Sequence, residues 1–230
     1  MCKLVVFDMD GTILDTLGDL QMAGNYALNI MGFPIHTREA YRSFIGKGLV
    51  NQMTQSLPEG HRNPKTVAKL TEIYLPYYAN HIKDNTYPFD GVQNMLAKLK
   101  QHGILLAVLS NKPDKYVATL AEYFFPGTFD KTMGKIDGIP LKPDPTSVKM
   151  ILAHFDISRE DCIFVGDSGV DIQTAKNAGL RVVAVSWGFS TKNTLSEFGD
   201  IAIIDDPNLI FKFIIDNKSS HDYNHSQSEN

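Results

Sequence analysis

The chain has 230 residues, of which 43 % are hydrophobic and 21 % are charged, a balance typical of folded globular proteins that excludes an intrinsically disordered chain. Its 22 basic and 26 acidic residues give a net charge of −4, which argues against a nucleic-acid-binding protein with its usual basic surface. Only two cysteines are present, no apolar run reaches the roughly 18 residues of a membrane span, and no signal-peptide core is apparent. We therefore expect a cytoplasmic protein that binds neither nucleic acid nor membranes.

Short apolar segments predict buried strands of a parallel sheet. They are, in chain order, residues 4–7, 104–109, 162–165, 182–185 and 201–204. Apolar residues also recur at helical spacing between strands, over residues 92–99, 117–124 and 148–155. This alternation of strand and helix predicts an α/β fold with a Rossmann-like parallel sheet as its core.

One long segment, residues 16–85, interrupts this alternation because it has helical patterns but no clear strand. About 70 helical residues exceed what a crossover between neighbouring parallel strands needs. We therefore predict a sheet core (residues 1–15 and 86–217) with an inserted α-helical domain (residues 16–85), in which Thr37 caps a helix. The polar residues 218–230 cannot bury enough apolar surface to fold and are predicted to be disordered.

Polar residues follow the first predicted strand directly, at the edge where ligands bind in open α/β sheets. Asp8 and Asp10 are two positions apart, so both carboxylates can face one point once the chain leaves the strand. Such a pair suits a nucleophile with a general acid or base, or a metal site, and Gly11 permits the sharp turn. An Asp-rich turn that merely caps a helix explains the same residues equally well.

A second and a third polar cluster are each ambiguous when taken alone. Ser110 and Asn111 follow the second strand and can bind an anion at a helix N-terminus, or simply cap that helix. Lys142 precedes Pro143 at the start of another helix and can neutralise phosphate charge, although most lysines are solvated surface residues.

The fourth cluster contains Asp167 and Asp171, four positions apart around a predicted strand–helix turn. Two carboxylates at this spacing suit Mg²⁺, a hard cation that prefers oxygen ligands. The alternative is a helix cap, by Asp167 or Ser168, beside an unrelated surface acid. The Mg²⁺ interpretation is favoured because the loop repeats the arrangement of acids at a strand end seen around Asp8.

Taken in order, the four clusters resemble the four motifs of the haloacid dehalogenase (HAD) superfamily of aspartate-dependent phosphohydrolases, over about residues 3–215. The segment DMDGTILDT (residues 8–16) is similar to the first motif, and Ser110 and Lys142 match the second and third. The segment GDSGVD (residues 166–171) matches the fourth. The helical insertion resembles the small α-helical cap of these enzymes.

The resemblance implies a Mg²⁺-dependent phosphomonoester hydrolase that works through an aspartyl-phosphate. Asp8 would attack phosphorus, and Asp10 would protonate the leaving group and then activate water. Ser110 would hold the transferring phosphoryl group and Lys142 would stabilise its charge. The implied metal ligands are Asp8, the backbone carbonyl of Asp10, Asp167 and Asp171, the last being a further ligand or an anchor for Lys142. The implied substrate-binding residues are Gly11, Thr12, Asn111 and Lys47.

The cap should decide the substrate, and its loop Gly46-Lys47-Gly48 resembles that of phosphoglycolate phosphatases. This resemblance implies 2-phosphoglycolate as the small phosphorylated metabolite, with Lys47 near the leaving group, although a flexible helix connection explains the loop as well. Alternatives in the superfamily are a pyrophosphatase, a sugar-phosphate phosphatase and a β-phosphoglucomutase. A non-catalytic binding protein of the same fold is the alternative of another class. We expect a monomer or a homodimer.

Overall fold

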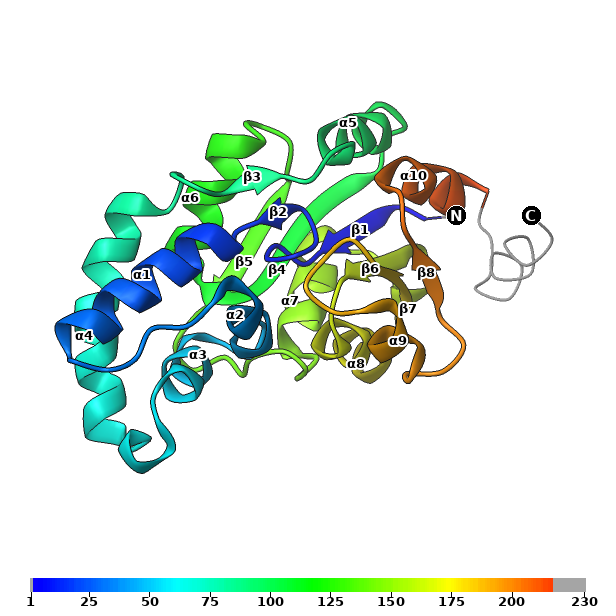
Figure 1. The fold of residues 1–230 in the computed structure, drawn as a ribbon. Helices are drawn as coiled ribbons and strands as arrows, with labels where there is room; N and C mark the ends of the chain where they lie inside the picture. Colours follow the sequence, from blue (N-terminus) through cyan, green and yellow to red (C-terminus); the bar gives the residue numbers. More distant parts are fainter. Residues whose placement is uncertain (1, 217–230) are drawn as a thin grey trace.

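The computed structural model describes residues 2–216, which form a parallel sheet with helices on both faces and a helical layer beside it (Figure 1). In the described part of the chain, six strands pair in parallel in the order β5-β4-β1-β6-β7-β8. Their bounds are β1 (Leu4–Phe7), β4 (Leu105–Pro113), β5 (Lys131–Lys135), β6 (Cys162–Gly166), β7 (Arg181–Val185) and β8 (Ala202–Ile204). The α/β fold with a parallel sheet, predicted from the apolar segments, is confirmed.

Two strand details differ from the prediction. The edge strand β5 has the polar sequence KTMGK, and only Met133 and Gly134 are buried, so it lacks the apolar run used to find the other strands. Strand β4 continues past Leu109 to Pro113, with an irregular register against β5. Ser110 and Asn111 therefore lie within β4, and the helix α6 (Asp114–Phe124) begins only after them.

Helices cover the two faces of the sheet (Figure 1). One face carries α5 (Val92–Gln101), α6 and α10 (Pro207–Ile215), and the other carries α7 (Thr146–Phe155), α8 (Gly169–Ala178) and α9 (Lys192–Ser196). Alternate residues of each strand point to opposite faces, so Val5 and Phe7 pack toward α5 whereas Leu4 and Val6 pack toward α7. Burial on both faces explains why the strands read as continuous apolar runs.

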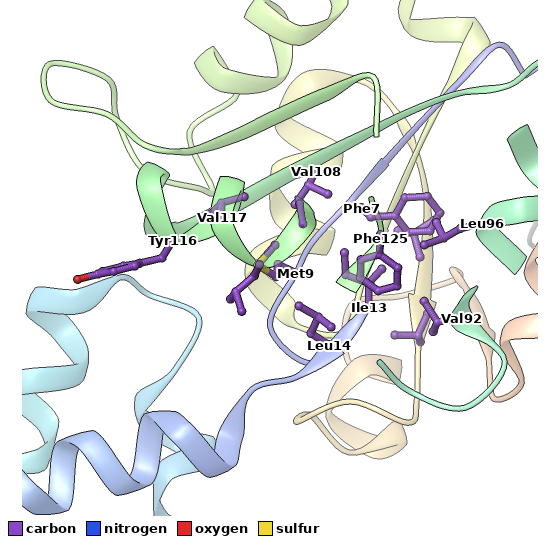
Figure 2. Close-up of a cluster of buried hydrophobic side chains, with 14 of the residues drawn as sticks. Phe7, Met9, Ile13, Leu14, Val92, Leu96, Val108, Tyr116, Val117 and Phe125 are labelled. Atoms are coloured by element: carbon purple, nitrogen blue, oxygen red, sulfur yellow. The ribbon is translucent and has the colours of Figure 1, made fainter. Parts of the chain in front are cut away.

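The buried side chains at the end of β1 anchor the loop that follows the strand. Met9, Ile13 and Leu14 are fully buried and join Phe7 in the cluster drawn in Figure 2. Met9 stands between the two acidic residues of the loop, and its burial in the core turns their side chains toward the cavity described below. The core thus sets the direction of Asp8 and Asp10.

Along the chain, the helical layer falls between two short strands, β2 (Leu14–Asp15) and β3 (Tyr87–Pro88), which pair antiparallel. The sequence did not predict these strands because each has only two residues. The helical layer contains α1 (Leu17–Ile30), α2 (Arg38–Phe44), α3 (Leu49–Ser56), the short η1 (Glu59–His61) and α4 (Pro64–His81). Thr37 caps α2, as predicted, by accepting a hydrogen bond from the Ala40 N–H.

The buried carboxylate of Asp19 on α1 holds the segment that leads from the helical layer back to the sheet. Asp19 accepts hydrogen bonds from the Asn85 N–H at 2.7 Å and from the Thr86 hydroxyl at 2.7 Å.

No helix of the described residues is long and apolar enough to cross a membrane. The predicted disorder of residues 218–230 lies outside the described part of the chain.

Candidate functional site

Three of the four polar clusters meet because β4, β1 and β6 are neighbours in the sheet. Asp8 follows β1, Ser110 lies in the extension of β4, and Asp167 follows β6, so all three stand at the carboxyl edge of the sheet. The Asp8 N–H donates to the Val165 carbonyl at 2.9 Å, which continues the pairing of β1 with β6 up to the site. Ligands of open α/β sheets bind at this edge.

Lys142 is buried at the centre of the site rather than solvated on the surface. Its Nζ donates to Asp8 Oδ1 at 2.6 Å, to Asp171 Oδ1 at 2.7 Å and to the Leu109 carbonyl at 3.0 Å. These three acceptors match the three protons of an ammonium group. Lys142 therefore joins the end of β1, strand β4 and the first turn of α8 through one charge.

The side chain of Asn111 holds the backbone of Lys142 in place. Its Oδ1 accepts from the Lys142 N–H at 2.8 Å, and its Nδ2 donates to the Lys142 carbonyl at 3.0 Å. The same Nδ2 donates to the Gly46 carbonyl of the helical layer at 3.0 Å. The family resemblance implied a substrate-binding role for Asn111, and the structure adds this positioning role for its side chain.

The charges in the site perturb one another strongly. Burial raises the pKa of Asp8 well above its usual value, and although Lys142 lowers it, the carboxylates of Asp171, Asp167 and Asp10 raise it further. Burial alone would lower the pKa of Lys142, but Asp171 and Asp8 more than offset this and raise it. Lys142 therefore stays protonated, whereas the ionised form of Asp8 is destabilised by its surroundings.

Asp167 is fixed by two donors and by two glycines. The Phe189 N–H donates to its Oδ2 at 2.6 Å, and the Thr12 hydroxyl donates to its Oδ1 at 3.3 Å. Gly11 and Gly188 approach this carboxylate so closely that a Cβ on either would collide with it. Gly11 also has φ +92°, a conformation that favours glycine. Thr12 and Gly11 thus position Asp167.

The second acid, Asp10, has a separate environment. Lys112 Nζ lies 2.9 Å from Asp10 Oδ1, and both side chains are largely buried. The Thr16 hydroxyl donates to the same oxygen at 2.6 Å. Lys112 also lies 5.2 Å from the centre of the Tyr78 ring on α4. Lys112 directly follows Asn111 in the second cluster but was not among the predicted site residues.

The carboxylates of Asp8, Asp167 and Asp171 form a group that fits a divalent cation. One oxygen from each lies within 4.8 Å of the others, and all three residues are buried. Lys142 supplies one positive charge for three nearby acids, so a cation would relieve the remaining repulsion. Asp171 contacts Lys142 directly, and its other oxygen accepts from the Ser168 hydroxyl at 2.6 Å. The Asp10 carboxylate is not in this group.

A cavity of about 70 Å³ lies over these residues, between the sheet and the helical layer. Ligand pockets for drug-sized molecules are several times larger, so this one suits a small ligand. Asp8, Asp10, Ser110, Asn111, Lys142, Asp167 and Asp171 all line it.

Three predicted residues do not line the cavity: Gly11, Thr12 and Lys47. The first two lie behind Asp167, and Lys47 is exposed. The loop contacts the core through the backbone of Gly46, and Gly46 and Gly48 line the cavity whereas Lys47 does not. The cation that the helical layer brings to the cavity is Arg42 instead, which sequence reasoning missed. Its place one helical turn before the loop is the signal that could have found it.

Known proteins resemble this chain along most of its length. The family described as haloacid dehalogenase-like hydrolase matches residues 5–185. A phosphoglycolate phosphatase of Pseudomonas savastanoi pv. phaseolicola is 32% identical over 209 residues, covering 89% of this chain and 76% of that protein. A phosphoglycolate phosphatase of Vibrio cholerae serotype O1 is 30% identical over 223 residues, covering 93% of this chain and 97% of that protein. The solved structure of a protein described as a phosphoglycolate phosphatase from Lactobacillus delbrueckii subsp. bulgaricus superposes with a TM-score of 0.88 and is 35% identical. The match covers 92% of this chain and 98% of that one.

Proposed function

Because the chain belongs to the haloacid dehalogenase-like hydrolase family, we propose that it is a phosphatase that hydrolyses 2-phosphoglycolate through an aspartyl-phosphate on Asp8. One observation carries the proposal: two acids line one cavity, and each has its own lysine. Asp8 is paired with Lys142 and Asp10 with Lys112. Two carboxylates in different environments can take different roles in one reaction.

In the first proposed step, Asp8 attacks the substrate phosphorus. Lys142 binds Asp8 Oδ1, so attack falls to Oδ2. An oxygen–phosphorus bond forms to Asp8 while the bond from phosphorus to the glycolate oxygen breaks. Asp10 gives its proton to that departing oxygen. Lys142 offsets the repulsion between the carboxylate and the phosphoryl oxygens.

In the second proposed step, water attacks the phosphorus of the aspartyl-phosphate. Asp10 takes the proton of this water, the bond to Asp8 breaks, and inorganic phosphate leaves. Lys112 Nζ lies 2.9 Å from Asp10 Oδ1 and holds this carboxylate at the cavity. The proton that Asp10 gives up in the first step leaves it as the base that the second step needs.

We propose Mg²⁺ as the cofactor, held by Asp8, Asp167 and the backbone carbonyl of Asp10, with Asp171 as anchor of Lys142. The buried oxygen donors support a hard cation. When bound, such a cation neutralises charge on the phosphoryl group and its attacking carboxylate.

The pKa of Asp167 predicts how this cation changes stability with pH. Burial, and then the charge of Asp171, raise it to about 7 in the absence of metal. Between the unfolded value of about 3.9 and about 7, the folded protein binds more protons than the unfolded chain, so stability falls as pH rises through this window. A cation binds the ionised form and opposes this loss. We therefore expect Mg²⁺ to raise Tm more at pH 8 than at pH 5.5, measured by thermal unfolding against EDTA.

The control for this prediction is Asp167→Asn, which keeps the shape but removes the charge. In EDTA at pH 8 it should be at least as stable as the native protein, and Mg²⁺ should shift its Tm little. An Mg²⁺ shift that is equal at both pH values, or that survives in Asp167→Asn, would show that Asp167 does not bind the cation.

The proposed function is tested by the release of phosphate from a panel of substrates with Mg²⁺ or EDTA. The panel holds 2-phosphoglycolate, pyrophosphate, glucose 6-phosphate and β-glucose 1-phosphate, which represent the alternatives. Conversion of β-glucose 1-phosphate to glucose 6-phosphate is followed separately, because a mutase releases no phosphate. We expect 2-phosphoglycolate to have the highest kcat/KM, by at least about tenfold, since the small cavity disfavours a hexose. The absence of both Mg²⁺-dependent hydrolysis of any member and isomerisation of β-glucose 1-phosphate would favour a non-catalytic binding protein, and a higher kcat/KM for another member would replace 2-phosphoglycolate as the substrate.

A further inference from the structure

We propose that Arg42 binds the anionic group at the far end of the leaving group, so that the site selects phosphomonoesters that also carry a carboxylate. The inference rests on the proposed function and assigns one residue to its substrate specificity. Arg42 lies in the last turn of α2 and lines the same cavity as Asp8, Asp10 and Lys142. It therefore belongs to the helical layer and faces the phosphate-binding residues across the cavity.

The guanidinium of Arg42 is only weakly engaged. Its ion pair with Glu39 measures 3.5 Å, and the Glu39 side chain is 82% exposed. An exposed pair of this kind contributes little free energy. A ligand carboxylate can therefore replace Glu39 at small cost, and the planar guanidinium can bind its two oxygens together.

The other cations of the cavity are already neutralised by buried acids. Lys142 is shared between Asp8 and Asp171, and Lys112 is paired with Asp10. Among the described residues that line the cavity, Arg42 is the cation without a buried carboxylate partner. A substrate with a phosphate dianion and a carboxylate adds a further negative charge beyond the phosphate, and Arg42 is the group that can compensate it.

The polar atoms and the size of the cavity agree with such a leaving group. Tyr78 lines the cavity, and its buried hydroxyl has no hydrogen-bond partner in the described part of the chain. An unsatisfied buried hydroxyl is costly, and a polar substrate would satisfy it. The volume of about 70 Å³ leaves room for a short acid but not for a long chain between phosphate and carboxylate.

The neighbouring loop fixes the position of Arg42. The Gly46 carbonyl accepts from Asn111 Nδ2, and Gly48 lies so near Leu141 that a Cβ there would be 2.8 Å from its Cδ1. Gly46 and Gly48 have φ of +95° and +86°, where glycine is favoured. The loop thus docks on the core by its backbone, leaves Lys47 outside, and holds the end of α2 over the site.

The test compares 2-phosphoglycolate with 2-hydroxyethyl phosphate, in which a neutral CH₂OH replaces the carboxylate. In Arg42→Gln we expect kcat/KM for 2-phosphoglycolate to fall by ~10- to 100-fold, mostly through KM, because a charge-assisted hydrogen-bonded pair is lost. For 2-hydroxyethyl phosphate the change should be less than about threefold, since neither the phosphate contacts nor the fold is altered. Arg42→Lys should recover part of the loss. Glu39→Gln, which breaks the same ion pair from its other side, should leave both substrates unchanged.

Several outcomes would overturn the inference. Arg42→Gln could impair both esters equally, or neither, and Lys47→Gln could instead cause the carboxylate-specific loss. A native protein that hydrolyses both esters equally well would retain the proposed phosphatase chemistry but refute selection by Arg42. A native protein that hydrolyses neither would refute the proposed function itself.

Discussion

Asp8→Asn is expected to reduce kcat by at least about 10⁴-fold while leaving the protein folded, because the change removes the proposed nucleophile but keeps its shape. The amide oxygen can still accept the hydrogen bond from Lys142 Nζ. Because burial raises the pKa of Asp8, a neutral amide is tolerated there at least as well as the carboxylate, so Tm should not fall. Steady-state kinetics with 2-phosphoglycolate and a thermal unfolding curve measure the two effects.

The matched control is Asp137→Asn. Asp137 is a fully exposed acid just after β5, and its Oδ1 lies 3.5 Å from Lys135 Nζ. It should retain native kcat and Tm. Transfer of labelled phosphate to the protein, trapped by acid quench, should be seen in the native protein and not in Asp8→Asn. If Asp8→Asn retained turnover within tenfold of native, Asp8 would not be the nucleophile.

Lys142→Met is expected to destabilise the protein as well as inactivate it. The change leaves Asp8 and Asp171 buried beside one another without their shared cation. Removing one partner of a buried ion pair costs about 3–5 kcal/mol, because the remaining charge is uncompensated. This loss should be larger at pH 8 than at pH 5, where Asp8, whose pKa burial raises, can be protonated instead. Denaturant unfolding at both pH values measures it.

The activity of Lys142→Met should not return when stability is restored. Mg²⁺ can neutralise the charge repulsion among the buried carboxylates of Asp8, Asp167 and Asp171, so it should recover part of the lost stability. Turnover should stay at least about 10³-fold below native, because no ammonium orients Asp8 or stabilises the phosphoryl charge. Lys149→Met, on the exposed side of α7, is the control and should change neither property. Full recovery of turnover by Mg²⁺ would mean that Lys142 serves only stability.

Local patterns were enough to predict most of the fold. Strands buried on both faces, such as β1 and β6, are runs of apolar residues, so their positions follow from where these runs lie in the sequence. The polar edge strand β5 and the two-residue strands β2 and β3 carry no such signal, and only pairing with their neighbours defines them. The boundaries proposed for the two domains stay a prediction.

The sequence by itself determined which acids, which lysine and which order of clusters this protein has, because Asp8, Ser110 and Asp167 come at or just after the ends of apolar segments and Lys142 lies between the last two. Only the tertiary structure decided what these residues contact. Asn111 holds the Lys142 backbone, Lys112 pairs with Asp10, and Arg42 rather than Lys47 lines the cavity. These contacts join segments far apart in the chain, so no local spacing encodes them. Strand order and the docking of the helical layer bring them together.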